Sequence, residues 1–189
     1  MRNLLGNSEK SDIKAELMIE KPIKSKPGFT LIEALVVLAL LGIISLALYP
    51  NIRNSLETRS LENSAREILT SLQTAKFQAV KEKLYHRLRF FTQEERWMYT
   101  VERQIEAGNW VKVPGTVFKT VPAGFNLTLA LPNDMVTFSP MGMVVDFDTA
   151  QNSITLQSPS LERQNQPDLR IVSVFAGGSI RYAESESGG

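Results

Sequence analysis

An apolar run from Phe29 to Tyr49 places the strongest constraint on what this chain can fold into, because its only charged residue is Glu33. A helix of that length is roughly 30 Å long, which is the thickness of the hydrocarbon core of a bilayer. A helix that is apolar on every face is typical of a membrane span, and the run is too long for a secretory signal peptide. We therefore predict a transmembrane helix over residues 29–50.

The hydrophobic period changes after this run. Apolar residues now recur at spacings of three and four: Leu61, Ala65, Ile68, Leu72, Ala75 and Ala79. Charged residues fill the other positions, so residues 51–86 are predicted to form an amphipathic helix whose pattern ends at about Lys83. Pro50 lacks an amide hydrogen and clashes with the preceding turn, which predicts a kink where the helix leaves the membrane.

The remainder of the chain has the alternation of short strands, punctuated by Gly and Pro. We predict a β-rich domain over residues 87–183 and a disordered polar tail over residues 184–189. The predicted fold class is α+β, with the long N-terminal helix packed on an antiparallel sheet. The expected strands are Arg87–Phe91, Arg96–Gln104, Trp110–Val113, Phe125–Leu131, Met135–Phe138, Gly142–Phe147, Ser153–Leu156, Leu169–Phe175 and Ser179–Tyr182.

Residue types exclude several kinds of active site. The chain has no cysteine and one histidine, His86, so disulfides, zinc–thiolate centres and thiol nucleophiles are impossible. A Ser-His-Asp triad would have to use His86, which lies at the predicted helix-to-strand junction. Asp134, Asp146 and Asp148 could supply oxygen ligands to calcium, although two Asp two residues apart are more typical of a turn. We predict a protein that is not an enzyme and that has no cofactor and no metal.

A Gly-Phe pair preceded by lysines opens the apolar run. The lysines of Lys21–Lys26 are followed by Gly28-Phe29-Thr30-Leu31-Ile32-Glu33. This sequence resembles the class III signal of type IV pilins and of the pseudopilins of type II secretion, including a glutamate as the fifth residue after the Gly-Phe junction. The resemblance implies a leader peptide, residues 1–28, that prepilin peptidase cleaves between Gly28 and Phe29. It also implies N-methylation of the new terminus at Phe29.

The presence of Glu33 in the apolar run requires an explanation, since a charge inside a membrane helix costs roughly 2.5–3.5 kcal/mol. The resemblance implies that Glu33 faces the terminal amine of a neighbouring subunit, which offsets part of this cost and favours one register of assembly. The alternative is a glutamate that faces lipid and is simply protonated. The leader is longer than is usual for this signal, and a translation start at Met18 instead of Met1 would give the usual length.

Weaker features are similar to the H-type minor pseudopilins (GspH- or FimT-like). They are the Ala-rich helix, the turn Phe138-Ser139-Pro140-x-Gly142, the strand Ile154–Leu156 and the ending Arg170-Ile171-Val172…Gly178-Ser179-Ile180. The resemblance implies a single-pass inner-membrane protein with its C-terminal domain in the periplasm. It would assemble with other major and minor pseudopilins into the type II secretion pseudopilus, as a structural subunit for protein export. Lysines before the span agree with a cytoplasmic leader.

A FimT-like minor type IV pilin, acting in pilus biogenesis or DNA uptake, is the alternative function. Phosphate binding needs clustered positive charge, and acidic and basic residues nearly balance over residues 29–189. Arg163, Arg170 and Arg181 lie among acidic residues. Glu94 and Glu95 are expected in a solvated hairpin loop. The densest basic patch is Lys81, Lys83, Arg87 and Arg89, which could equally favour the helix dipole. We therefore expect no nucleic-acid partner, with DNA uptake kept as the second hypothesis.

Overall fold

The computed structural model describes residues 28–187, apart from the side chains of residues 47–51. The chain divides between Ile43 and Ile44 into two compact units, and each is treated by itself. One long helix, α1 (Leu31–Glu82), contributes to both units. The predicted leader, residues 1–27, and the alternative start at Met18 lie outside the described residues.

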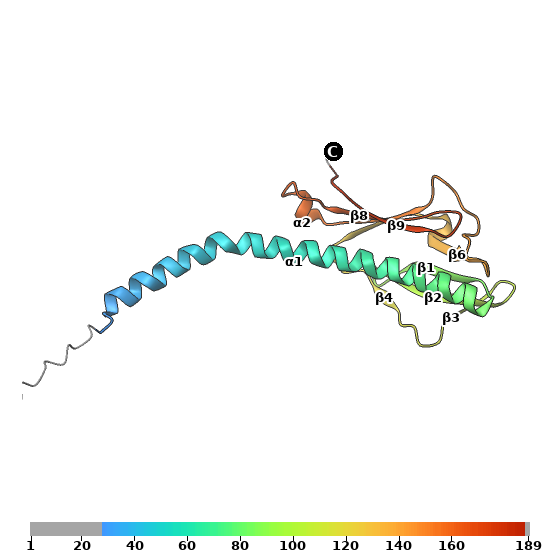
Figure 1. The fold of residues 1–189 in the computed structure, drawn as a ribbon, viewed down its shortest axis with the longest axis horizontal. Helices are drawn as coiled ribbons and strands as arrows, with labels where there is room; N and C mark the ends of the chain where they lie inside the picture. Colours follow the sequence, from blue (N-terminus) through green and yellow to red (C-terminus); the bar gives the residue numbers. More distant parts are fainter. Residues whose placement is uncertain (1–27, 188–189) are drawn as a thin grey trace, which may run out of the picture. The chain divides into compact units, whose positions relative to one another are not determined.

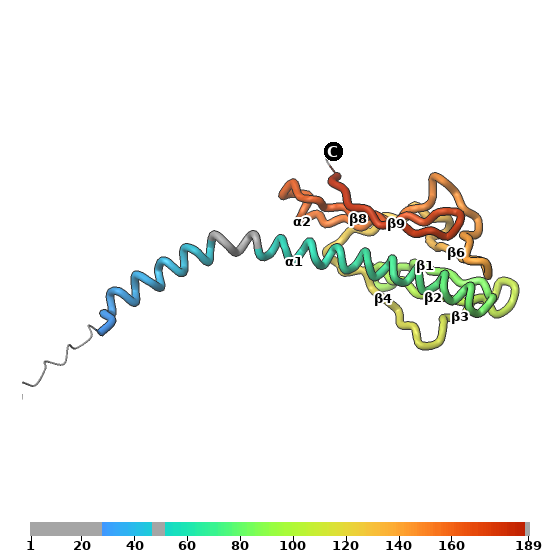
Figure 2. Tube along the Cα trace, viewed as in Figure 1, coloured from blue at the N-terminus to red at the C-terminus, as the bar shows by residue number. Residues whose placement is uncertain are grey.

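The second unit contains two antiparallel sheets, and Figures 1 and 2 show them on different sides of α1. Sheet A has the order β3-β2-β1-β6, with β4 also paired to β2, and sheet B has the order β5-β7-β8-β9. Sheet A consists of β1 (His86–Gln93), β2 (Arg96–Glu106), β3 (Asn109–Lys112), β4 (Lys119–Thr120) and β6 (Met135–Phe138). Sheet B consists of β5 (Asn126–Ala130), β7 (Ser153–Gln157), β8 (Leu169–Val174) and β9 (Ile180–Ser185). Two short helical segments, η1 (Pro132–Asp134) and α2 (Pro159–Glu162), connect strands.

The core of this unit lies between the predicted apolar stripe of α1 and the inner faces of the two sheets. All six stripe residues are buried, from Leu61 to Ala79. Alternate residues of the strands face them, and they include Leu88, Phe90, Tyr99, Val101, Ile154, Leu156, Val172 and Val174. Three alanines in the stripe let the sheets approach the helix closely, because their side chains are short. The predicted α+β fold class, with a long helix on antiparallel strands, is confirmed.

The end of α1 is close to its predicted position. The helix stops at Glu82, and Lys83 has a φ of 58°, a left-handed conformation that breaks the helical repeat. The predicted end near Lys83 is therefore confirmed. The wider range of 51–86 is too long, since β1 already begins at His86.

One strand prediction and the tail prediction need correction. The segment Gly142–Phe147 is not a strand and makes only an isolated bridge between Phe138 and Val144. Gly142 and Asp146 have φ values of 78° and 56°, which a strand cannot accommodate. The tail predicted to be disordered from residue 184 is wrong as far as Ser187. β9 continues to Ser185, and the Ser187 amide donates to Asp168 Oδ1 at 2.9 Å.

Candidate functional site

The segment from Gly28 to Glu33 forms the start of α1. The Thr30 carbonyl accepts from the Ala34 amide at 3.1 Å, and the Thr30 hydroxyl accepts from the Glu33 amide at 3.2 Å. Thr30 is therefore the N-cap residue, and Thr30 with Glu33 occupies the two sequence positions of a capping box. Gly28 and Phe29 precede the cap and are exposed, outside any helix. The bond between them is therefore exposed and lies outside α1.

Glu33 lies in the first turn of α1, where a negative charge is favourable to the helix dipole. No cation among the described residues pairs with its carboxylate. The position therefore allows two roles: stabilising the helix start within the chain, or pairing with a positive group from another subunit. The sequence analysis predicted only the second role, which stays a prediction, and it missed the first, although Thr30-x-x-Glu33 was a readable signal.

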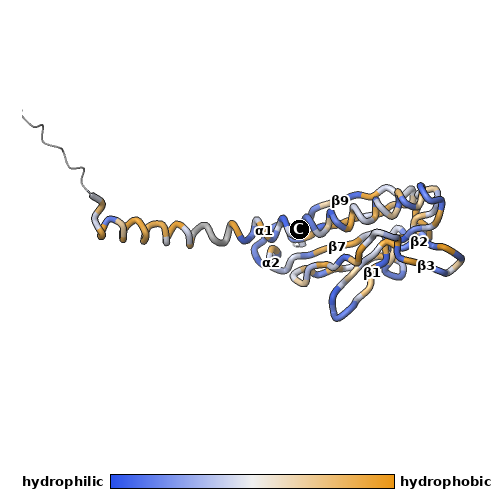
Figure 3. The backbone as a smooth tube through the Cα atoms, turned by 90° about the horizontal axis from the view of Figure 1, so that it is seen from below, coloured by the Kyte–Doolittle hydropathy of each residue, from blue (hydrophilic) through white to orange (hydrophobic). Residues whose placement is uncertain are grey.

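The apolar residues that follow are unburied within their own unit. From Phe29 to Ile43 the large apolar side chains are 42% to 78% exposed, and Figure 3 shows the hydrophobic colour recurring along these turns. An exposed apolar surface of this kind marks a surface that something else covers.

Within the described part of the chain, no helix is both long enough and apolar enough to cross a membrane. The predicted span 29–50 includes residues 47–50, whose side chains lie outside the described set. Pro50 is one of them, so its predicted kink stays a prediction.

The only histidine is fully buried at the junction of α1 and β1. His86 Nδ1 lies 3.2 Å from the Leu84 carbonyl oxygen, and Nε2 lies 3.5 Å from Glu82 Oε2. A side chain in this position cannot reach a substrate. It supports the joint between the helix and the first strand instead.

The candidate calcium ligands form a turn. Asp148 Oδ1 accepts from the Ala150 amide at 2.9 Å, which is the geometry of an Asx turn. Among the described residues no three His, Cys, Asp or Glu side chains come together as a metal site.

The predicted basic patch is divided by the structure. Arg87 Nε donates a hydrogen bond to Glu102 Oε2 at 2.6 Å, and Arg87 Nη2 forms an ion pair with the same oxygen at 2.6 Å. The Arg87 guanidinium also lies 4.1 Å from the centre of the Trp110 ring. Arg89 also approaches Glu102, at 3.7 Å. These two arginines are partly neutralised on the outer face of sheet A. Lys81 and Lys83 are exposed at the end of α1.

One of the three C-terminal arginines, Arg170, does not contribute to a basic surface. Arg170 is 1% exposed, and its Nη1 donates to the carbonyls of Pro167 and Leu169 at 3.1 and 2.9 Å. Its Nη2 lies 3.3 Å from Glu184. Arg170 is therefore a structural residue that holds β8 to β9, out of reach of a phosphate backbone.

Asp168 lies directly before β8 and two residues before Arg170, and it connects sheet B to the C-terminal segment. Its side chain accepts from Gln157 Nε2 at 3.0 Å and from the Ser187 amide at 2.9 Å. Burial acts to raise the pKa of Asp168, but these hydrogen bonds outweigh it and hold the pKa below its usual value. The ionised carboxylate thus fastens the C-terminal segment to the sheet.

A further surface, which sequence reasoning missed, lies beside the second half of α1. We call it the distal groove: a hollow of about 360 Å³ lined by Gln73, Lys76, Phe77, Val80, Gly178, Ser179 and Ile180. The sequence signal was available, since Phe77 and Val80 are apolar residues that fall outside the buried stripe of the amphipathic helix.

Gly178 lines this groove, and the turn at Gly142 contacts it. A Cβ on Gly178 would lie 1.9 Å from the Gly142 carbonyl oxygen, and one on Gly142 would lie 3.0 Å from Val80 Cγ2. Both glycines have positive φ values, 74° and 78°. The two turns therefore meet because Gly178 has no side chain, and the Gly142 turn packs closely on α1 because Gly142 has none. Both turns are among the sequence features that are similar to those of the H-type minor pseudopilins.

Comparison with known proteins gives a motif and a fold. The family model of the prokaryotic N-terminal methylation motif matches residues 23–49. No curated protein sequence matches the chain. The minor pseudopilin EpsH from the type 2 secretion system of Vibrio cholerae has a similar structure, with a TM-score of 0.51 and 16% identity, over 66% of this chain and 96% of that one. The type IV minor pilin FimU of Pseudomonas aeruginosa aligns with a TM-score of 0.49 and 17% identity, over 67% of this chain and 90% of that one. The likeness to EpsH establishes a shared fold.

Proposed function

We propose that this type IV pilin-like chain is a minor pseudopilin, a non-enzymatic structural subunit of a type II secretion pseudopilus. One observation supports the proposal most strongly: the same chain has a methylation motif over residues 23–49 and a fold shared with a minor pseudopilin. Either feature alone would be less specific. Together they support a subunit that is processed at its N-terminus and then assembled.

The proposed pathway begins at the membrane. The apolar run 29–50 anchors the precursor in the inner membrane, with the leader in the cytoplasm and the C-terminal domain in the periplasm. Prepilin peptidase cuts between Gly28 and Phe29, which lie before the Thr30 cap, and the new amine of Phe29 is N-methylated. The exposed apolar side chains of residues 29–43 support this proposal, because lipid or neighbouring subunits must cover them.

Assembly then depends on Glu33. In the free subunit its carboxylate favours the first turn of α1. In the filament we propose that it pairs with the terminal amine of a neighbouring pseudopilin, so that one helix register is preferred. An unpaired charge at that depth would be penalised, which makes wrong registers less stable.

The first experiment tests processing. The precursor is expressed with its peptidase, and the membrane-extracted protein is sequenced from its N-terminus. The sequence should begin at Phe29, carrying an added methyl group. A Gly28→Leu precursor should remain uncut, while a Ser25→Ala precursor, changed before the junction, should be cut normally. A mature protein that begins elsewhere would remove the basis of the proposal.

The second experiment separates secretion from DNA uptake. Deleting the gene should leave exported proteins in the periplasm and leave natural transformation unchanged. Support for secretion comes from the engaged arginines, since Arg87, Arg89 and Arg170 each have an acidic partner. Loss of transformation with secretion intact would favour the FimT-like alternative. Purified protein should then bind duplex DNA, with an affinity that falls steeply with salt.

A further inference from the structure

Sheet B ends in an edge strand that has a neighbour on one side only. β9 is the last strand in the order β5-β7-β8-β9 and pairs with β8. Antiparallel pairing turns alternate backbone groups toward the neighbouring strand and the others away from it. The Phe175 amide donates to the Ser179 carbonyl at 2.9 Å, and the same alternation directs the odd-numbered residues of β9 toward β8. The backbone groups that point away from the sheet are those of Ile180, Tyr182 and Glu184.

These outward backbone groups are unpaired within residues 28–187. No other element of the described chain forms a hydrogen bond with the amide or carbonyl of Ile180, Tyr182 or Glu184. The opposite case is β6, an end strand of sheet A, whose Thr137 carbonyl accepts from the Val145 amide at 2.8 Å. A row of free donors and acceptors on a sheet edge is a template for another strand. The chain thus covers one sheet edge itself and leaves the β9 edge able to pair.

The distal groove continues into this edge. Ile180, the first residue of β9, lines the groove together with Phe77, which is 63% exposed. Lys76 Nζ donates to the Gly178 carbonyl at 2.9 Å and so holds the start of β9 beside α1. Figure 3 shows β9 running alongside the second half of the helix. A strand added to β9 would therefore place the side chain opposite Ile180 on the apolar floor formed by Phe77.

Arg181 gives the edge a preference for charge. It is exposed, and its guanidinium lies 5.2 Å from the centre of the Phe175 ring, but no carboxylate of the described residues forms an ion pair with it. In a new antiparallel pair, Arg181 would take a position without ladder hydrogen bonds, where opposite Cα atoms are only about 4.5 Å apart. An acidic residue is favourable opposite it. The edge therefore suits a strand with the pattern apolar, acidic, apolar.

A second copy of this chain offers no such strand. If two β9 strands paired antiparallel through their free edges, the residue opposite Arg181 would be odd-numbered, and the odd positions of β9 are Arg181, Ala183 and Ser185. One of these registers places Arg181 opposite itself, where like charges repel. The strands at the other ends of the two sheets, β3, β5 and β6, contain no Asp or Glu. The free edge therefore favours a different protein as its partner.

We propose that β9 is a strand-addition site for an extended segment of a non-identical pilin-like subunit, with the pattern apolar, acidic, apolar. Backbone hydrogen bonds to Ile180, Tyr182 and Glu184 provide the affinity, and contacts with Phe77 and Arg181 provide the specificity. The proposal rests on the proposed function, because a contact of this size is too small to hold two proteins together in solution. It forms where membrane helices already hold unlike subunits side by side.

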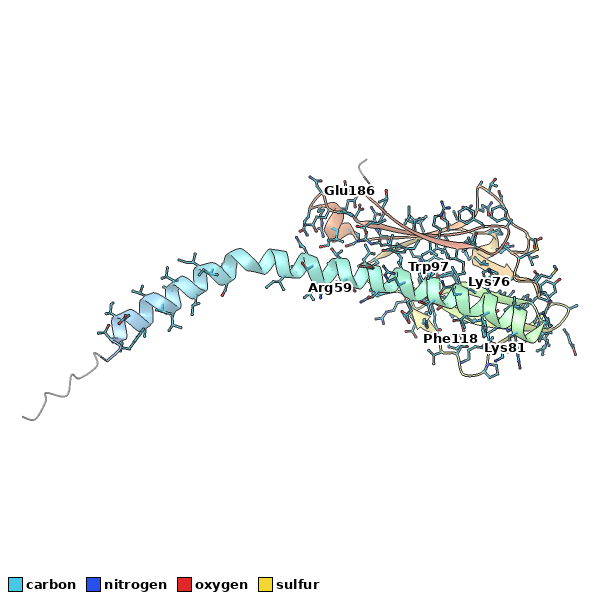
Figure 4. The ribbon with its side chains drawn as sticks, in the orientation of Figure 1. Arg59, Lys76, Lys81, Trp97, Phe118 and Glu186 are labelled. Carbon is cyan, nitrogen blue, oxygen red and sulfur yellow. The ribbon has the colours of Figure 1, made fainter. Side chains whose placement is uncertain are left out.

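A photocrosslinking residue in the groove tests the contact. In the full-length protein p-benzoylphenylalanine replaces Phe77, which keeps an aromatic ring there, and the other pilin-like subunits of the assembly are co-expressed with distinct tags. Irradiation of membranes should link the protein to one non-identical subunit, and the linked peptide should contain the apolar, acidic, apolar pattern. The matched control replaces Phe118, which is 53% exposed and which Figure 4 shows on a different side of the helix from Lys76. Its yield of the same product should be at background.

Two substitutions of Glu184 isolate the backbone contact. Glu184→Pro removes an amide hydrogen that points away from β8, so no hydrogen bond within the sheet is lost. Glu184→Pro and Glu184→Ala both lose the ion pair with Arg170, so the comparison between them reports on the amide. The crosslink from position 77 should fall about fivefold or more with proline and persist with alanine. The two variants should have equal melting temperatures, which shows that the sheet is intact.

Arg181→Glu provides a second arm that leaves the backbone unchanged. The crosslink yield should fall about two- to fivefold, and a lysine in place of the acidic residue of the linked peptide should restore it. Four outcomes overturn the proposal: a yield equal to the Phe118 control, a product with a second copy of this chain, a product with an exported protein alone, or a yield indifferent to Glu184→Pro and Arg181→Glu. The processing and secretion tests do not involve β9, so failure of this contact is distinguishable from failure of the proposed function.

Discussion

The two halves of α1 use hydrophobic residues in different ways. Residues 29–43 expose their large apolar side chains around the helix, whereas residues 61–79 bury a single stripe between two sheets. The second half is stabilised by contacts that the chain makes with itself. The large apolar side chains described in the first half remain exposed, and under the proposed function lipid or another subunit covers them. The same residue type, leucine, should therefore contribute to assembly in one half and to folding in the other.

The largest expected effect would come from Glu33→Val. This change removes a charge from the first half, so membrane insertion and cleavage after Gly28 should persist. Incorporation into the filament should fall by two orders of magnitude or more, since breaking one partner of a buried pair costs about 3–5 kcal/mol. Crosslinking of the processed variant to partner subunits, beside a secretion assay, measures this. Normal crosslinking and normal secretion would show that Glu33 has no part in assembly.

Thr30 supplies the control for that experiment. Thr30→Ala removes the N-cap and leaves the carboxylate, and should weaken the helix start by only about 1 kcal/mol. Its effect on assembly should be much smaller than that of Glu33→Val. Equal effects would mean that Glu33 acts by capping the helix within its own chain.

The comparison is sharpest when one substitution is made in both halves. Leu72→Ala empties part of a fully buried site and should lower the free energy of unfolding of the second unit by about 2–5 kcal/mol. Leu38→Ala, at a position 64% exposed, should leave that free energy unchanged within about 0.5 kcal/mol. Thermal unfolding of the full chain in detergent, followed through the sheet signal, compares the two. A large loss for Leu38→Ala would contradict the division of roles.

A third pair tests whether the second unit is held by close backbone contact as well as by its stripe. Gly178→Ala adds a Cβ where the Gly142 carbonyl oxygen lies 1.9 Å away, at a φ of 74°. We expect a loss of about 2–4 kcal/mol in unfolding free energy. Gly177→Ala, directly beside it, enters open space and should change little. Equal melting temperatures for the two variants would mean that the turns can separate without loss.

The smallest expected effect is a dependence on pH at the end of sheet B. The pKa of Asp168 is lowered in the folded protein by hydrogen bonds from Gln157 and Ser187. Its contribution to stability is therefore complete above the ordinary carboxyl pKa, near 4, and is lost as the pH falls through the lower folded value. Asp168→Asn should remove this part of the acid dependence. A steeper acid loss in the variant would give the opposite sign and refute the assignment.

The elements with strong periodicity could be predicted from the sequence. Local backbone geometry explains why the strand prediction over Gly142–Phe147 failed. The stripe from Leu61 to Ala79 was readable because a helix repeats every 3.6 residues. Gly142–Phe147 alternates like a strand, yet two left-handed residues limit its strand pairing to one isolated bridge at Val144. β4 has only two residues, Lys119–Thr120, which is too few for a visible period.

Some of the candidate site residues could likewise be named from the sequence, and others are visible only in the folded structure. Gly28, Phe29 and Glu33 were readable because they stand together in one short motif. The distal groove was not, because it brings α1 together with two turns that are distant in the sequence, at Gly142 and Gly178. Arg170 could be named as a basic residue, but only the fold reveals that it is buried among carbonyl groups.

The stripe of α1 has one further consequence, for how genes of this kind can change in length. Both sheets rest on the same six side chains of α1. Successive residues of an α-helix are rotated about 100° around its axis, so only the spacing of three and four residues keeps these six on one face. A codon inserted or lost between Leu61 and Ala79 would turn every later stripe residue away from both sheets at once. Substitutions along this stretch can accumulate one at a time, but its length should be fixed among functional variants, while the exposed loop between β3 and β4 can grow or shrink.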